Sequence, residues 1–262
     1  MRVGAILSPV GDWRAILESA RVADAGGLDA IGFWDHYHSE KPEWAYVCGW
    51  SAYGALAAAT ARVKLTPMVI CRLNYTLGVL AKESAILAIA SGGRFELGIG
   101  AGDYPIEYSA WHQPFPDATT RVETLAESIA ALRQIWLGGA VTYSGKQIQL
   151  TDAACTPVPP TPPRVVAGVG GSRRMVRSAV AYADELNLYS DAELVKFAKA
   201  EIAKSGRPID LSVYLHWDTW PEDPRGELAR WEEHGASRAL ICVGFQPDMP
   251  ARVAELAMAS KQ

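Results

Sequence analysis

VKLTPMVI (residues 63–70) and RFELGIG (residues 94–100) are two short, largely apolar runs that lie about a helix length apart in the chain. Each has the length and composition of a β-strand, and turn residues follow the second run at Gly102. Apolar strands that alternate with helices form parallel sheets covered by helices on both faces. The two runs therefore predict one unit of an α/β fold.

The same pattern recurs on both sides of this unit. Six more apolar runs are VGAILS (3–8), AIGFW (30–34), RVVAGV (164–169), ELNLY (185–189), DLSVYLHW (210–217) and ALICVGF (239–245). Eight strand and helix repeats are the number that closes into a barrel, and a length of 262 residues suits one such domain. We expect a single (β/α)8 TIM barrel over residues 1–262, with an open doubly wound sheet as the alternative.

The segments between the strands have helical periodicity. WRAILESARVADAGG (13–27) places Ile16, Ala20 and Ala23 on one face and ends in two glycines that suit a helix C-cap. Residues 117–136 carry apolar side chains three and four positions apart, with charged residues between them. Both segments are predicted to be helices that wrap a barrel.

Two segments between the fourth and fifth strands depart from this repeat. VTYSGKQIQL (141–150) alternates around Ser144 and Gly145 like a β-hairpin. CTPVPPTPP (155–163) is too rich in proline for a helix or a central strand. We expect a small hairpin insertion followed by a stiff connector that leads into strand five.

Composition excludes several classes of function. The net charge of −4 gives no reason to expect nucleic acid or an anionic membrane surface as a partner. No apolar run approaches the roughly 20 residues of a membrane span, and the N-terminal run is too short for a signal peptide, so a cytoplasmic protein is expected. Cys48, Cys71, Cys155 and Cys242 are far apart, which favours reduced, mostly buried thiols.

In an α/β barrel, catalytic residues follow the C-terminal ends of the strands. Asp35, His36, Tyr37 and His38 follow strand two, and His36 can exchange a proton near neutral pH. The His-x-His spacing also occurs in metal-dependent hydrolases, but such sites usually take the pair from strand one. We therefore expect no metal.

Two glycine-rich turns follow strands four and five. Gly100, Ala101 and Gly102 let the backbone approach a flat or phosphorylated ligand closely. The second turn, GVGGSRR (168–174), combines flexible glycines with a serine hydroxyl and two arginines, which suits a phosphate. A tight turn with solvated arginines is the alternative.

Several motifs in combination resemble the bacterial luciferase-like monooxygenase superfamily. They are ALAAATARVKL (55–65), AKESAILAIASGGRFELGIGAGDYP (81–105), TTRVETLAESIAALRQIW (119–136) and the hairpin, prolines and RVVAGVGGS (164–172) described above. The resemblance covers residues 1–190 well and the remainder loosely. It implies a barrel that binds either flavin mononucleotide (FMN) or the deazaflavin coenzyme F420.

The resemblance also implies roles for individual residues. The pair Asp35–His36 is typical of the deazaflavin branch, in which Asp35 would contact the cofactor and His36 would exchange a proton near the ring. Asp103 falls where some of these enzymes have an acidic catalytic residue. Three further groups would hold the cofactor: Met68–Val69, which matches a non-prolyl cis peptide, then Cys71 and Arg72, and the phosphate loop of Gly168, Gly170, Gly171 and Ser172.

The resemblance leaves three functions open. The first is an F420-dependent oxidoreductase that passes hydride to or from a small organic substrate. The second is an FMN-dependent monooxygenase supplied with reduced flavin by a partner reductase, and the third is a non-catalytic flavin-binding barrel. One departure from the family is Glu40, where some deazaflavin dehydrogenases have an aromatic residue, although Trp44 is close by. Homodimers are usual in the family.

Overall fold

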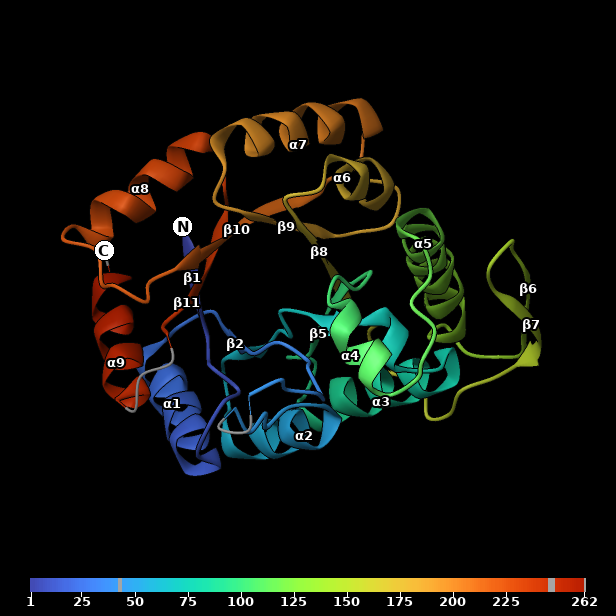
Figure 1. Cartoon of the computed structure of the whole chain (residues 1–262), viewed down its shortest axis with the longest axis horizontal. Coiled ribbons are helices and arrows are strands. Elements are labelled where there is room, and N and C mark those ends of the chain that lie inside the picture. The colour runs from blue at the N-terminus through green and yellow to red at the C-terminus, as the bar shows by residue number, and fades with distance from the viewer. Residues whose placement is uncertain (42–43, 245–247, 262) are drawn as a thin grey trace.

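The computed structural model of the protein describes residues 1–41, 44–244 and 248–261. In this part of the chain, nine strand segments form one parallel sheet that curls around the centre of the molecule (Figure 1). Their order across the sheet is β3-β2-β1-β11-β10-β9-β8-β5-β4. The segments are β1 (Arg2–Ile6), β2 (Ala30–Gly32), β3 (Lys64–Leu65), β4 (Ile70–Cys71), β5 (Glu96–Gly100), β8 (Arg164–Gly170), β9 (Glu185–Tyr189), β10 (Asp210–His216) and β11 (Arg238–Cys242).

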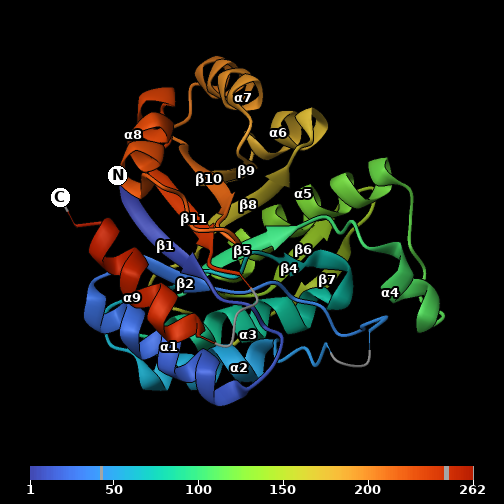
Figure 2. The ribbon, with the colours of Figure 1, turned by 60° about the vertical axis from the view of Figure 1, so that its left-hand side comes forward.

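Helices surround the curled sheet on the outside (Figure 1). The helix α4 is the exception, since it stands apart from this outer layer at one end of the molecule (Figure 2). The helices are α1 (Trp13–Gly26), α2 (Trp50–Ala59), α3 (Leu77–Ala90), α4 (Pro105–Ala110), α5 (Ala118–Ile135), α6 (Arg173–Ala179), α7 (Ala192–Ser205), α8 (Pro224–His234) and α9 (Met249–Ala259). The predicted helices over 13–27 and 117–136 correspond to α1 and α5.

The third strand differs from the prediction. A continuous strand was expected over residues 63–70, but only β3 and β4 at its two ends are in the sheet, and residues 66–69 leave it. The peptide bond between Met68 and Val69 is cis, as the resemblance implied. Leu65 also bridges Phe95 in parallel, so β3 adjoins the segment that leads into β5. The two strands at the ends of the sheet order, β3 and β4, thus both adjoin β5 or the segment that leads into it.

The hairpin and the connector lie between α5 and β8. The strands β6 (Val141–Ser144) and β7 (Gln149–Ala153) form a separate antiparallel sheet, which projects beyond α5 (Figure 1). Glu127 on α5 holds the hairpin turn, because its carboxylate accepts hydrogen bonds from three backbone amides of residues 146–148. The proline-rich residues 155–163 are neither helix nor strand, as predicted.

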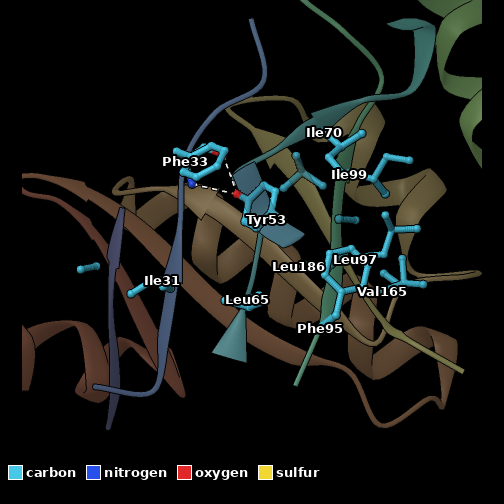
Figure 3. Packing of buried hydrophobic residues seen from close by; sticks show 14 of the residues in the cluster. Ile31, Phe33, Tyr53, Leu65, Ile70, Phe95, Leu97, Ile99, Val165 and Leu186 are labelled. Carbon is cyan, nitrogen blue, oxygen red and sulfur yellow. Dashed lines mark hydrogen bonds between the residues drawn. The ribbon is translucent and has the colours of Figure 1, made fainter. Parts of the chain in front are cut away.

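The core lies between the sheet and the helices (Figure 3). Leu97 and Val165 project from the neighbouring strands β5 and β8, Ile31 projects from β2, and all three are fully buried. Tyr53 of α2 stacks on Phe33 at 4.3 Å, and its hydroxyl bonds both the backbone N–H and the carbonyl of Phe33. This contact fixes the chain immediately before Asp35.

Within the described residues, no helix is long and apolar enough to cross a membrane.

Charged side chains gather at the N-terminal ends of the strands. Arg238 is fully buried at the start of β11, and its guanidinium lies 2.8 Å from Asp29, 2.7 Å from Glu96 and 3.3 Å from Glu185. Lys64, Arg164, Arg2 and Asp210 extend this network at the starts of four more strands. In α/β barrels this end serves stability.

Candidate active site

A cavity of about 850 Å³ opens at the C-terminal ends of the strands. Residues from β4, β5, β8, β9 and β10 or from the segments that follow them line it, together with the segment after β2 and the first turn of α5. Its size is that of a pocket for a cofactor and a small ligand.

The structure brings the predicted site residues together, with one exception. The cavity is lined by His36, Asp103, Asp35, Met68, Val69, Cys71, Gly100, Ala101, Gly102, Gly168, Gly170, Gly171 and Ser172. They come from four separate stretches of sequence that only the curled sheet makes neighbours.

Arg72 is the exception. It was expected to lie along the cofactor, but it does not line the cavity. Its buried guanidinium donates hydrogen bonds to the Ser128 hydroxyl on α5 and to the carbonyl of Tyr75. The reason is that the chain turns into a short 3-10 helix at Arg72, which carries the side chain away from the cavity. Arg72 therefore joins α5 to the chain after β4.

Asp35 is buried and is held by groups from the chain after β4. The Tyr75 hydroxyl donates to Oδ1 at 3.0 Å, and the Asn74 amide lies 3.4 Å from Oδ2. Burial is the largest influence and raises the pKa of the Asp35 carboxyl above its ordinary value, although these hydrogen bonds oppose it. Asp35 is thus a polar group with a fixed orientation at the edge of the cavity.

His36 is held by a buried carboxylate that comes from α4. Glu107 is 1% exposed, and its Oε2 lies 3.4 Å from Nδ1 of His36. The other oxygen, Oε1, accepts hydrogen bonds from the backbone N–H groups of Tyr37 and His38. One carboxylate therefore fixes both the loop after β2 and the imidazole, and it leaves Nε2 of His36 as the nitrogen for a ligand.

The floor of the cavity is formed by the segment between β3 and β4. Val69 packs against the glycines of the two neighbouring strands, so that a Cβ at Gly100 would lie 2.7 Å from its Cγ2 and a Cβ at Gly168 would lie 2.5 Å from its Cγ1. A Cβ at Gly98 would lie 1.7 Å from the carbonyl oxygen of Pro67. The glycines of β5 and β8 thus make room for this floor.

Two arginines lie near the glycine turns, Arg121 beside the turn after β5 and Arg174 just beyond the turn after β8. Arg174 donates to the Thr119 hydroxyl at 2.8 Å, and Arg121 donates to the carbonyls of Gly102 and Pro116. Both side chains line the cavity. The backbone at Gly170 has a φ of 53°, which favours glycine. Together these groups form a polar end of the cavity suited to an anion.

Sequence reasoning missed several residues of the site. Glu107 and Tyr75 were not predicted, nor were the cavity residues Arg121, Asn187, Tyr189, Tyr214 and His216. The proline at the first position of α4 is a helix-start signal that could have placed Glu107 on a helix beside the glycine turn. Tyr214 and His216 alternate at the end of β10, which could have indicated residues that face the interior of the barrel.

The thiols differ in part from the expectation. All four cysteines are free, but Cys242 alone is fully buried and the other three are partly exposed. The Cys48 thiol donates to the carbonyl of His36 at 2.8 Å, and burial raises its pKa to about 12. Cys48 therefore stays protonated and supports the loop that carries His36.

Among the residues that the structure describes, no group of three His, Cys, Asp or Glu side chains could hold a metal ion.

Solved structures share this fold. An F420-dependent secondary alcohol dehydrogenase superposes with a TM-score of 0.85 at 17% identity, over 100% of this chain and 99% of the other. The coenzyme F420-dependent tetrahydromethanopterin reductase of Methanopyrus kandleri has a TM-score of 0.82 at 16% identity, over 98% and 97% of the two chains. The monooxygenase RslO1 of Streptomyces bottropensis has a TM-score of 0.83 at 17% identity, over 99% and 98%.

Sequence relatives have a longer chain than this one. The F420-dependent glucose-6-phosphate dehydrogenase of Tsukamurella paurometabola is 26% identical over 228 residues, which are 80% of this chain and 66% of the relative. The enzyme of the same name from Kineococcus radiotolerans is 30% identical over 222 residues, 79% of this chain and 64% of the relative. The matches thus span less than two thirds of these relatives. The luciferase-like monooxygenase family matches residues 1–234, and the chain belongs to this family.

Proposed function

We propose that the protein is an F420-dependent oxidoreductase that transfers hydride to or from a small organic substrate. The observation that carries the proposal is that one cavity holds Asp35–His36, the Met68–Val69 floor and the glycine turn after β8. The names of the relatives support the choice of F420 over FMN.

The residues present fit this cofactor. The backbone around Val69 forms a floor on which a flat ring can lie, because Gly100 and Gly168 carry no side chain that would displace it. Arg121, Arg174 and the backbone of Gly170 and Gly171 offer cations and flexible amides to a phosphodiester. When bound, the deazaflavin would supply the hydride chemistry, and the protein would supply orientation and proton transfer.

We assign proton transfer at the substrate oxygen to Nε2 of His36. Glu107 is a positioning residue, because its carboxylate contacts Nδ1 of His36 and the two amides that follow in the loop. Asp35 would hold the polar edge of the ring, and Asp103 is a second acidic group at the cavity. Trp34 lines the cavity before Asp35 and would help to exclude water from the ring.

Titration of the purified protein with F420 and with FMN tests the proposal. We expect F420 to bind at least about tenfold more tightly than FMN, by quenching of the cofactor's fluorescence. His36→Ala should retain F420 binding and lose turnover. Tighter binding of FMN would support the monooxygenase with a partner reductase instead, and unchanged biological output of His36→Ala would support a non-catalytic flavin-binding protein.

We also propose that residues 1–262 form one closed (β/α)8 domain in which β3 and β4 are the two halves of the third strand. The bridge between Leu65 and Phe95 supports this count, because it joins β3 to the chain before β5 while β4 pairs with β5 itself. A single cooperative unfolding transition, observed by both fluorescence and circular dichroism, is the expected result.

A homodimer is the proposed assembly. Val79, Ile86 and Ile89 are each about two fifths exposed on α3, at spacings that place them along one side of the helix. An exposed apolar strip of this kind favours contact with a second protein surface. Light scattering coupled to gel filtration should give twice the chain mass, and Ile86→Lys should reduce it to one chain mass.

A further inference from the structure

Two arginines and two carboxylates, Asp35 and Asp103, are among the side chains that line the cavity. Its basic side chains other than histidine, among the described residues that line it, are Arg121 and Arg174. Both contact the N-terminal part of α5 or the segment that leads into it, through Thr119 and Pro116. His36, in contrast, contacts the loop after β2 and α4. The proton-transfer group and the cations thus have different hydrogen-bond partners.

The arginines are oriented toward the glycine turns. The Arg121 guanidinium lies 4.1 Å from the Phe115 ring, and its hydrogen bonds to Gly102 and Pro116 fix it beside the turn after β5. Arg174 immediately follows the turn after β8 and is tied to α5 through Thr119. Their hydrogen bonds to described residues go to Gly102, Pro116 and Thr119, which lie outside the loop that carries His36. Both are placed for the phosphodiester of the cofactor.

The surroundings of His36 carry the opposite charge. Its ring lies 5.2 Å from the Tyr104 ring and 5.6 Å from the Tyr46 ring. The Tyr104 hydroxyl donates to the Glu40 carboxylate at 2.8 Å, and Glu107 lies against Nδ1 of His36. Aromatic rings and carboxylates therefore surround the group assigned to proton transfer.

Among the described residues, no lysine or arginine forms an ion pair with Glu40 or Glu107. Lys41 is the basic residue of the loop after β2, but it is exposed, it does not line the cavity, and its ammonium lies 4.3 Å above the Trp44 ring. Residues 42–43, 245–247 and 262, which the structure does not describe, include no lysine or arginine in the sequence. A phosphate group bound beside His36 would thus lie close to the buried carboxylate of Asp35, which lines the cavity and forms no ion pair with a described residue, and this is costly.

We propose that the substrate is a small uncharged alcohol or the corresponding carbonyl compound, with an apolar or aromatic body, and not a sugar phosphate. This rests on the proposed F420-dependent function. Tyr189, Tyr214 and His216 line the cavity at the ends of β9 and β10 and offer further aromatic surface to such a body. The substrate class thus differs from the one in the names of the sequence relatives.

The reaction balances with groups already named. In the oxidising direction, the alcohol carbon loses a hydride, which reduces the deazaflavin, and the alcohol hydroxyl loses its proton to Nε2 of His36. The carbon–oxygen single bond becomes a carbonyl. In the reverse direction, the carbonyl compound takes the hydride from the reduced cofactor and the proton from His36.

The first experiment separates the substrate class from the cofactor. F420 binding to the wild-type protein is measured first, and its absence would contradict the proposed function itself. The F420-loaded protein is then titrated calorimetrically with cyclohexanol, 1-phenylethanol, glucose 6-phosphate and inorganic phosphate. We expect at least one alcohol to bind about tenfold more tightly than either phosphate compound and to be oxidised. Tighter binding of glucose 6-phosphate, or no binding of either alcohol, would overturn the inference.

The second experiment tests whether Arg121 and Arg174 bind the phosphodiester of F420. Arg121→Ala and Arg174→Ala should each weaken F420 binding by about tenfold or more. They should leave unchanged the binding of the deazaflavin–ribitol fragment, which lacks the phosphodiester. The matched control is Lys41→Ala, which should alter neither affinity. If Lys41→Ala or an arginine variant instead weakened glucose 6-phosphate binding while F420 affinity stayed constant, a sugar phosphate site would be shown and the inference would be wrong.

Discussion

Glu107 organises the site at the scale of single residues. A fully buried carboxylate is costly unless hydrogen bonds or charges compensate for it, and here two backbone N–H groups and one imidazole do so. The same contacts hold His36 in one orientation. In the proposed reaction Glu107 would therefore act through His36, since it does not line the cavity itself.

Replacement of Glu107 by glutamine should lower kcat by about 10- to 100-fold, because His36 loses the group that orients it. The affinity for F420 should change little, since Glu107 is outside the cavity. Glu107→Asp, which keeps the charge, should recover part of the loss. The exposed Glu233 on α8 supplies the control variant, Glu233→Gln, with near-normal kcat. Equal losses of kcat and of F420 affinity would show that Glu107 serves only the stability of the loop.

Asp35 provides a test by pH. Because burial raises the pKa of its carboxyl above the ordinary value of 3.8, the folded protein binds more protons than the unfolded chain between the two pKa values. The free energy of unfolding contributed by Asp35 therefore falls as pH rises through this window. The Asp35→Asn variant lacks this titration. The free energy of unfolding of the variant minus that of wild type should therefore increase with pH and then level off.

Urea unfolding of wild type and Asp35→Asn from about pH 3.5 to about pH 7 measures this difference. A difference that did not change with pH, or that favoured wild type increasingly at higher pH, would mean that the hydrogen bonds from Tyr75 and Asn74 outweigh the effect of burial on this carboxyl.

At the scale of elements, the site depends on how the segment between β3 and β4 meets β5 and β8. This segment leaves the sheet, and Val69 occupies the space that side chains on the two neighbouring strands would take. The fit explains why two neighbouring parallel strands, β5 and β8, contain glycines, which otherwise weaken strands. The floor of the cavity and the glycines therefore form a matched pair of surfaces.

Gly168→Ala tests this match. Its new Cβ would lie 2.5 Å from Cγ1 of Val69, so we expect a loss of about 1–3 kcal/mol in the free energy of unfolding together with weaker F420 binding. Adding Val69→Ala should recover most of the lost stability. Gly171→Ala is the control from the same turn, because its nearest neighbour would be 3.9 Å away. Similar losses for both alanine variants would argue against the packing explanation.

At the scale of the whole molecule, the two ends of the sheet have separate tasks. The C-terminal ends of the strands form the cavity, whereas the N-terminal ends carry an ion-pair network centred on Arg238. Its four basic and four acidic side chains come from strands or segments far apart in sequence: Arg2, Lys64, Arg164, Arg238, Asp29, Glu96, Glu185 and Asp210. The network ties the beginnings of most strands together.

Arg238→Ala should lower the free energy of unfolding by about 3–5 kcal/mol, because it leaves buried carboxylates without their partner. The matched surface variant, Arg230→Ala, removes an exposed pair with Glu227 and should cost less than about 1 kcal/mol. Denaturant unfolding gives both values. A small loss for Arg238→Ala would show that Lys64 and Arg164 compensate for these carboxylates without it.

Local pattern determined much of this architecture. The strand predicted over 185–189 is β9 with the same bounds, and the helices predicted over 13–27 and 117–136 are α1 and α5 within a residue at each end. Periodicity and capping residues act over a few positions, so they can be recognised in the sequence without knowledge of the tertiary structure. The glycine turns and Asp35–His36 were found for the same reason, since a barrel places catalytic residues directly after its strands.

Tertiary structure decided what depends on distant partners. The break in the third strand follows from close contact with glycines of β5 and β8, which no local pattern of residues 63–70 reveals. Arg72 turns toward Ser128, 56 residues away in the chain, and Glu107 reaches His36 across 71 residues. The sequence alone therefore determined the repeats and the positions after the strands, whereas the side-chain partners of the site arose only when the curled sheet brought separate strand ends within hydrogen-bond distance.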